Sequence, residues 1–222
     1  MRLNIYLNEI TKGSGKRVLS IFQKQIPKVK NDFISKKWNI SDLDAIKILN
    51  TYFSKNHIKF KLFRKISKGI YDFVKSGESF DDGSIEIFLN KGFSSYWISN
   101  FSKDPNSFDD FDKNLVFKQL FYILSHEMIH KTQFNKSNDS LDDKKDKSKK
   151  DKSNDDLDYF SSTHEVEAYA YQAYLQYMSN KGKSDVFNFY ITHFKKNDPV
   201  LKRFFKKFYQ YLDKQDKKSG GK

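Results

Sequence analysis

The chain of 222 residues contains no cysteine. Disulfide bonds, thiolate metal sites and thiol catalysis are therefore excluded. The sequence also lacks an apolar run of membrane-spanning length, and its first residues alternate apolar and polar side chains where a secretory leader carries a continuous apolar core. We expect no membrane insertion and, by default, a cytoplasmic location.

A phosphate-binding glycine loop, a zinc finger and a DNA-recognition helix pattern are also missing, although the formal net charge is +13. Lysines and aromatic residues interleave over residues 202–212, a pattern that could bind phosphates and stack on nucleic-acid bases. The same spacing gives an aromatic helical stripe, including Phe204 and Phe208, that would pack on a core with lysines at its rim. We favour packing, and keep a basic nucleic-acid-associated protein as the alternative.

The most informative segment is residues 124–130, which reads L-S-H-E-M-I-H. On a helix, His126 and His130 lie one turn apart on one face, where both imidazoles can bind one zinc ion. Glu127 stands about 100° round the helix, where it can act as general base toward a zinc-activated water. The segment therefore predicts a catalytic zinc site.

The preceding residues, 114–124, are apolar nearly all the way round and predict a buried helix, with Asp112 as its N-cap. Two histidines and a glutamate entering such a helix each need a polar partner, and a metal ion satisfies them together. The competing interpretation is a core helix whose histidines are satisfied by hydrogen bonds alone.

A second helix, predicted over residues 161–174, offers the third zinc ligand in Glu167, Glu165 or His164. Ser162 and Glu165 form the S-x-x-E pattern of a capping box, which gives Glu165 a structural role. Glu167 lies further in, on a face that continues through alanine and tyrosines, and a buried carboxylate needs a metal or a partner. We therefore prefer Glu167 and keep Glu165 as the alternative ligand.

Together, H-E-x-x-H and a later glutamate-bearing helix resemble the zincin metallopeptidases, specifically the gluzincin-like group, over roughly residues 57–180. In that group a small residue often follows the ligand glutamate three positions later and an aspartate four positions later. Glu167 is followed by Ala170 and then by Tyr171 instead of aspartate. Glu165 fits equally well, so the family pattern does not choose between the two.

The resemblance implies an α+β zincin-like fold and a zinc-dependent peptidase that hydrolyses protein or peptide substrates. It also implies an edge strand that binds extended substrate, for which residues 85–89 are our candidate. In related enzymes a tyrosine or histidine often assists the oxyanion, and Tyr171 and His193 are weak candidates here. A catalytically degenerate zincin-like protein is the alternative within the same fold.

Alternating side chains predict a small N-terminal sheet, antiparallel or mixed, with strands at residues 3–7, 58–62, 69–73 and 84–89. Helical spacing predicts further helices at 17–29, 41–53, 184–194 and 200–212. We expect one structural domain, formed by an N-terminal part (1–136) and C-terminal helices (159–213). A disordered charged insert (137–158) and a disordered basic tail (214–222) complete the chain.

Overall fold

The computed structural model describes residues 14–66, 73–80, 82–137 and 155–219. It is a mixed α+β protein, mostly helical, with a single three-stranded sheet in these residues, so the predicted α+β class is confirmed. The chain forms two compact units, Met1–Met128 and Ile129–Lys222. Helix α5 (Leu115–Ser137) is continuous across this boundary.

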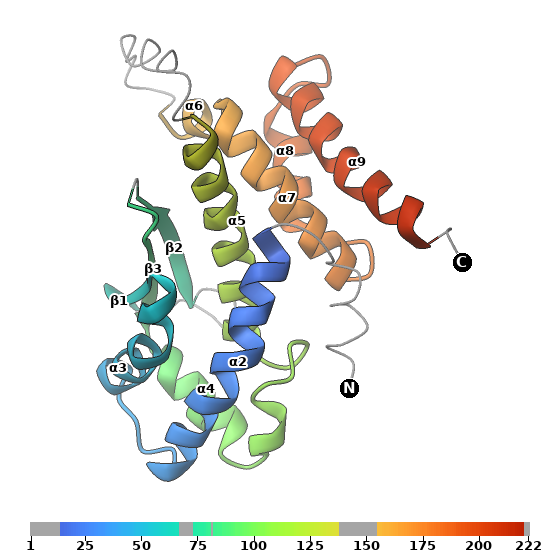
Figure 1. Cartoon of the computed structure of the whole chain (residues 1–222). Helices are drawn as coiled ribbons and strands as arrows, with labels where there is room; N and C mark the ends of the chain where they lie inside the picture. Colours follow the sequence, from blue (N-terminus) through green and yellow to red (C-terminus); the bar gives the residue numbers. More distant parts are fainter. Residues whose placement is uncertain (1–13, 67–72, 81, 138–154, 220–222) are drawn as a thin grey trace. The chain divides into compact units, whose positions relative to one another are not determined.

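The first unit combines the sheet with helices, coloured blue to green in Figure 1. Its elements are α2 (Ser14–Ser35), α3 (Asp42–Phe53), β1 (Ile58–Ile66), β2 (Val74–Ser79), β3 (Ile85–Lys91) and α4 (Phe93–Phe101). Short 3-10 turns at Ser54–Asn56 and Pro105–Ser107 join some of them. Helix α3 packs on α2 and β1, and α4 packs on α3 and β3.

The strand order is β1-β3-β2, with β1 parallel and β2 antiparallel to β3. The predicted edge strand, residues 85–89, is therefore wrong, because it belongs to the central strand. Its apolar residues, Ile85, Ile87 and Leu89, are at most 1 % exposed, as a strand paired on both sides requires. The polar strand β2 (V-K-S-G-E-S) is an edge instead.

Two helices of this unit are capped at their first residues by side-chain hydrogen bonds. Ser41 caps α3 as predicted: its side chain accepts from the backbone N–H of Asp44 and donates to the Asp44 carboxylate. Helix α4 begins after Gly92, which has no capping side chain and a φ of +95°. The Asp42 carboxylate accepts from the N–H of Gly92 (2.8 Å) and of Ser94 (3.1 Å), so α3 supplies the missing cap.

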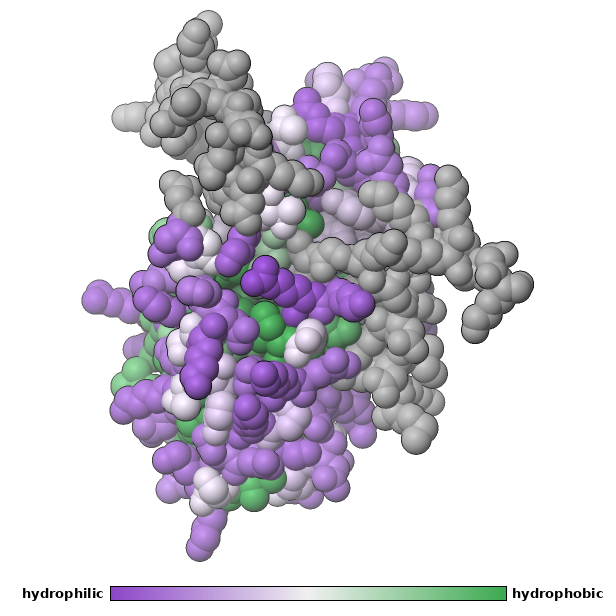
Figure 2. All heavy atoms as spheres, in the orientation of Figure 1, coloured by the Kyte–Doolittle hydropathy of each residue, from purple (hydrophilic) through white to green (hydrophobic). Residues whose placement is uncertain are grey.

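The second unit contains α6 (Asp155–Ser161), α7 (Thr163–Ser179), α8 (Asp185–His193) and α9 (Pro199–Ser219), besides the end of α5. Helix α7 contacts the other three (Figure 1). The rings of Tyr190 and Phe204 stack with centroids 4.1 Å apart and join α8 to α9. Hydrophilic side chains cover most of the described surface on the face in Figure 2.

Several predicted elements shift or cannot be compared. Predicted strand 3–7 lies outside the described residues, as does most of 69–73. The strand that forms the hairpin with β3 is β2, which follows the predicted segment 69–73. Of the predicted insert, residues 138–154 are outside the description, and residues 155–158 belong to α6. The predicted disordered tail is wrong up to Ser219, because α9 continues to that residue.

None of the helices in the described part of the chain has the length and apolarity needed to cross a membrane.

Candidate metal centre

The motif lies on α5, whose start is fixed by Asn114. The Asn114 Oδ1 accepts from the backbone N–H of Phe117 (2.9 Å) and from the indole N–H of Trp97 (2.9 Å). The amide nitrogen of Asn114 donates to the carbonyl of Phe108 at 2.6 Å. The predicted N-cap, Asp112, is therefore wrong. Asn114 is fully buried and caps the helix from inside the core.

The polar residues of the motif are buried along with the apolar residues before them. His126, Glu127 and His130 are 4 %, 5 % and 7 % exposed. Transferring a carboxylate and two imidazoles out of water is costly unless charged or hydrogen-bonding groups compensate. The burial of all three therefore indicates that this turn of α5 faces compensating groups.

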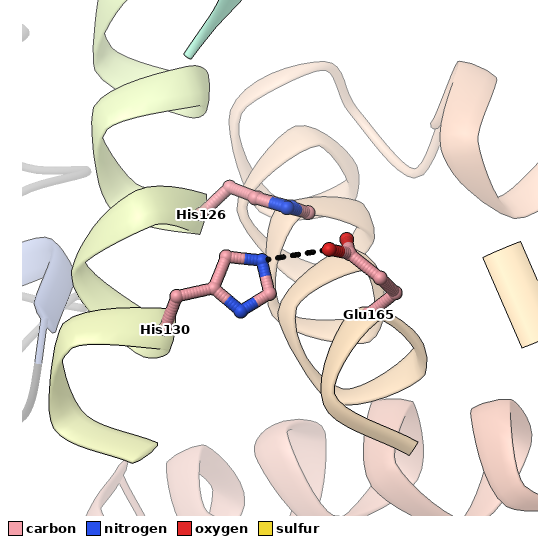
Figure 3. A group of neighbouring side chains, drawn as sticks. All are labelled: His126, His130 and Glu165. Carbon is pink, nitrogen blue, oxygen red and sulfur yellow. Dashed lines mark ion pairs between the residues drawn. The ribbon is translucent and has the colours of Figure 1, made fainter. Parts of the chain in front are cut away.

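Helix α7 supplies one such group. Ser162 caps this helix, as predicted, by accepting from the backbone N–H of Glu165. The carboxylate of Glu165 faces α5 instead of returning to the cap, and its Oε1 lies 3.3 Å from Nε2 of His130. Figure 3 shows His126, His130 and Glu165 pointing toward one another.

These three residues form a cluster in which one potential ligand atom from each lies within 4.8 Å of the others. It is the one group of three or more His, Cys, Asp or Glu side chains with metal-binding spacing that the described residues contain. The donor set of two imidazoles and one carboxylate is typical of catalytic zinc sites. The cluster could hold a metal ion.

The other two glutamate-helix candidates lie elsewhere. Glu167 Oε1 accepts from Lys207 Nζ at 2.9 Å, and its Oε2 accepts from the Gln133 amide at 3.4 Å. The side chain of His164 is exposed. The geometry therefore favours Glu165, our alternative, over Glu167. Our preference for Glu167 assumed that the capping box engages the carboxylate of Glu165, whereas Ser162 caps the helix through the backbone N–H of Glu165 and the carboxylate faces α5.

Glu127 lies close to strand β2. A Cβ atom placed on Gly77 of β2 would lie 2.7 Å from Cγ and 2.9 Å from Oε1 of Glu127. The same Cβ would lie 2.8 Å from Ile123 Cγ2. Glycine at position 77 thus allows the edge strand β2 to run directly beside the predicted general base. Sequence analysis missed this residue, because nothing local distinguishes this glycine from the others.

Neither oxyanion candidate gains support from its surroundings. Tyr171 is buried and its ring lies 5.0 Å from that of Tyr211. His193 is exposed at the end of α8, where it stacks on Phe189. Both residues have the aromatic contacts of structural side chains.

Two tyrosines near the glutamates have raised pKa values. Burial raises the pKa of Tyr190 well above its ordinary value, and the charges of Tyr169 and Glu165 add to this; its hydroxyl donates to the carbonyl of Phe160 at 2.9 Å. Burial likewise raises the pKa of Tyr211, with further contributions from the charge of Glu167, from Tyr171 and from a hydrogen bond to Glu167. Both hydroxyls therefore stay protonated as hydrogen-bond donors at neutral pH.

The aromatic stripe of α9 is largely internal. Phe204 and Phe208 are 0 % and 2 % exposed, whereas Lys202 and Lys206 are exposed. Buried rings cannot stack on nucleic-acid bases, so these two phenylalanines serve packing, as expected. Tyr209 is exposed on the same helix.

Comparison of the chain with protein-family models, with curated proteins and with solved structures gave no match.

Proposed function

We propose that this protein is a zinc-dependent peptidase in which His126, His130 and Glu165 bind the metal and Glu127 is the general base. The observation that carries the proposal is the cluster of two buried imidazoles and one half-buried carboxylate on α5 and α7, together with the buried carboxylate of Glu127, which follows His126 in the sequence. A closed structural zinc site uses four protein ligands, whereas a catalytic site uses three and keeps one position for water.

The contacts of His130 support a cation in this cluster. Its Nδ1 lies 3.0 Å from Gln133 Oε1, which only accepts hydrogen bonds, so Nδ1 carries a proton. In the neutral ring, Nε2 then presents a lone pair to the Glu165 oxygen 3.3 Å away. Two acceptors at this distance repel unless a proton or a metal cation lies between them.

The same separation supports zinc as that cation. Ligand atoms at about 2.0–2.1 Å from a tetrahedral zinc ion lie about 3.3–3.4 Å apart. The distance of 3.3 Å between His130 Nε2 and Glu165 Oε1 agrees with this value. The absence of thiolates and the presence of imidazoles also favour zinc over soft or purely oxygen-liganded metals.

A zinc ion held in this way supplies Lewis acidity that makes a water nucleophilic near neutral pH and polarises a carbonyl group. Glu127 accepts the proton that this water loses as it attacks the peptide carbonyl, and then donates it to the leaving amine. Gly77 of β2 lies against this side chain, so the close approach of the strand restricts where the carboxylate can move. Strand β2, an edge strand of the sheet within the described residues, is the proposed binding site for extended substrate.

The decisive experiment compares zinc content in two matched variants, Glu165→Ala and Glu167→Ala. We expect the purified wild-type protein to contain about one zinc per chain, and Glu165→Ala to lose it because a ligand is removed. Glu167→Ala should still contain zinc when it is supplied in excess. Metal analysis after dialysis, with thermal unfolding in the presence and absence of chelator, provides the measurement.

His130→Ala and His193→Ala provide a second matched pair, since both change a histidine to alanine but only one acts at the cluster. Loss of zinc from His130→Ala with full retention in His193→Ala is expected. Full zinc occupancy in both Glu165→Ala and His130→Ala would overturn the proposed metal centre. Salt-dependent binding to random DNA without hydrolysis of unfolded protein would instead favour the nucleic-acid-associated alternative.

A further inference from the structure

Gln133 lies on α5 one turn after His130 and has an orientation that its neighbours determine. Its amide nitrogen donates to the backbone carbonyl of His164 at 3.3 Å and to Glu167 Oε2 at 3.4 Å. A carbonyl and a carboxylate oxygen only accept hydrogen bonds, so the NH₂ end of the amide must face them. The amide oxygen must then face the other way.

That oxygen lies 3.0 Å from Nδ1 of His130. Because it accepts, it stabilises the tautomer of His130 in which Nδ1 carries the hydrogen. In this tautomer Nε2 is the ring nitrogen that carries the lone pair, and it is also the atom that lies beside Glu165. The hydrogen bond that His130 Nδ1–H donates to Gln133 thus selects the nitrogen that can bind a metal.

Glu167 in turn has its own supports, on α9. Its Oε1 accepts from Lys207 Nζ at 2.9 Å, and the half-buried Tyr211 also hydrogen-bonds to the Glu167 carboxylate. The side chains of Glu167 and Lys207 are 32 % and 33 % exposed, so solvent weakens this ion pair. The carboxylate is nevertheless held by donors from two helices, α5 and α9.

We propose that Glu167 and Gln133 are positioning residues for the metal centre: Glu167 orients the Gln133 amide, and Gln133 fixes the tautomer and ring orientation of His130. The glutamate that sequence analysis favoured as a ligand acts in this way through Gln133 and His130, without touching the metal. This inference rests on the proposed function, because a fixed tautomer has its use in ligand binding.

The first test measures the tautomer directly in zinc-free protein. Nitrogen-15 NMR of the imidazole ring distinguishes Nδ1–H from Nε2–H when the ring is neutral, and His130→Gln assigns the signal. We expect Nδ1–H for His130 in the wild type and loss of this preference in Gln133→Leu, which has similar volume but no amide. An Nε2–H tautomer in the wild type would overturn the inference.

The second test measures zinc affinity by competition with a chelating dye. Loss of an outer-shell partner typically weakens metal binding about 10–100-fold, and we expect this for Gln133→Leu and Glu167→Leu. Glu167→Gln keeps an acceptor oxygen for the Gln133 amide and should stay within about threefold of wild type. Rescue by this conservative change separates orientation of Gln133 from simple packing at position 167.

The remote support is tested by Lys207→Met with Lys206→Met as its matched control, since Lys206 is an exposed lysine of the same helix. A partly exposed ion pair contributes little, so Lys207→Met should weaken zinc binding by less than about fivefold and Lys206→Met not measurably. Equal effects of both variants would remove Lys207 from the proposal.

The two proposals fail in different ways. If the wild type binds no zinc, the proposed function falls, whereas the tautomer measurement still decides the role of Gln133. If the wild type binds zinc, and Gln133→Leu keeps both the wild-type tautomer and the wild-type affinity, the inference falls and the metal centre stands.

Discussion

Two consecutive stretches of helix α5 are buried to a similar extent with opposite chemistry. In the first, Leu120 and Leu124 are 0 % exposed among other apolar residues, and their burial itself stabilises the fold. In the second, His126, Glu127 and His130 are at most 7 % exposed, and their burial costs free energy that polar partners or a metal must offset. Changes in the first stretch should therefore affect stability, and changes in the second should affect chemistry.

The largest expected effect separates chemistry from folding in the second stretch. Glu127→Gln removes the general base while nearly preserving volume, so turnover on an unfolded, dye-labelled protein should fall by about 10²–10⁴-fold. Zinc content and thermal stability should be nearly unchanged. Asp213→Asn makes the same chemical change, carboxylate to amide, at an exposed position of α9 and should keep wild-type turnover. Equal turnover in both variants would exclude Glu127 as the base.

The opposite result is expected for the first stretch. Leu120→Ala leaves a cavity in a fully buried position and should lower the free energy of unfolding by about 2–5 kcal/mol, as measured by urea denaturation. Folded Leu120→Ala protein should still contain one zinc. Thr132→Ala changes an exposed residue of the same helix and should stay within about 0.5 kcal/mol of wild type. Loss of zinc from folded Leu120→Ala protein would show that the two stretches are not separable.

A smaller effect should arise where β2 meets the helix. In Gly77→Ala, the new methyl group would lie under 3.0 Å from Glu127 and Ile123, so these side chains must move. Overpacking of this kind costs about 1–3 kcal/mol of stability. Because Glu127 moves and the ligands do not, turnover should fall while zinc content is kept.

Steady-state kinetics with zinc analysis checks the Gly77 prediction, and Ser95→Ala, at an exposed position of α4, is the control. Wild-type turnover in Gly77→Ala would mean that the position of the Glu127 carboxylate tolerates this shift. The close approach of β2 to Glu127 would then not be needed for turnover.

Local patterns predicted the elements that depend on local interactions. Ser41 and Ser162 cap the helices that follow them through residues three positions later. Such a short spacing can be read directly from the sequence. The order of the strands does not follow in this way, because it depends on pairings across the sheet. A polar strand such as β2 shows weak alternation, and its place at the edge was missed.

The residues of the candidate site also differ in whether local spacing or distant contacts determine their positions. His126, Glu127 and His130 could be placed on one helix because their spacing is fixed by the helical repeat. The choice between Glu165 and Glu167 depends on how α7 is rotated toward α5, which helical spacing on α7 alone does not give. Lys207, the partner of Glu167, is 40 positions away, so its contact could not be foreseen.

The borrowed cap of α4 has a consequence for folding. The donors at the start of α4 bind a carboxylate that lies 50 and 52 positions earlier in the sequence. An isolated peptide spanning Phe93–Phe101 lacks this acceptor, and its nine residues are too short to form a stable helix in water. We therefore expect the order of helix α4 to depend on the docking of α3, a non-local contact of the first unit. Amide hydrogen exchange at Ser94 would report directly on whether α3 is docked.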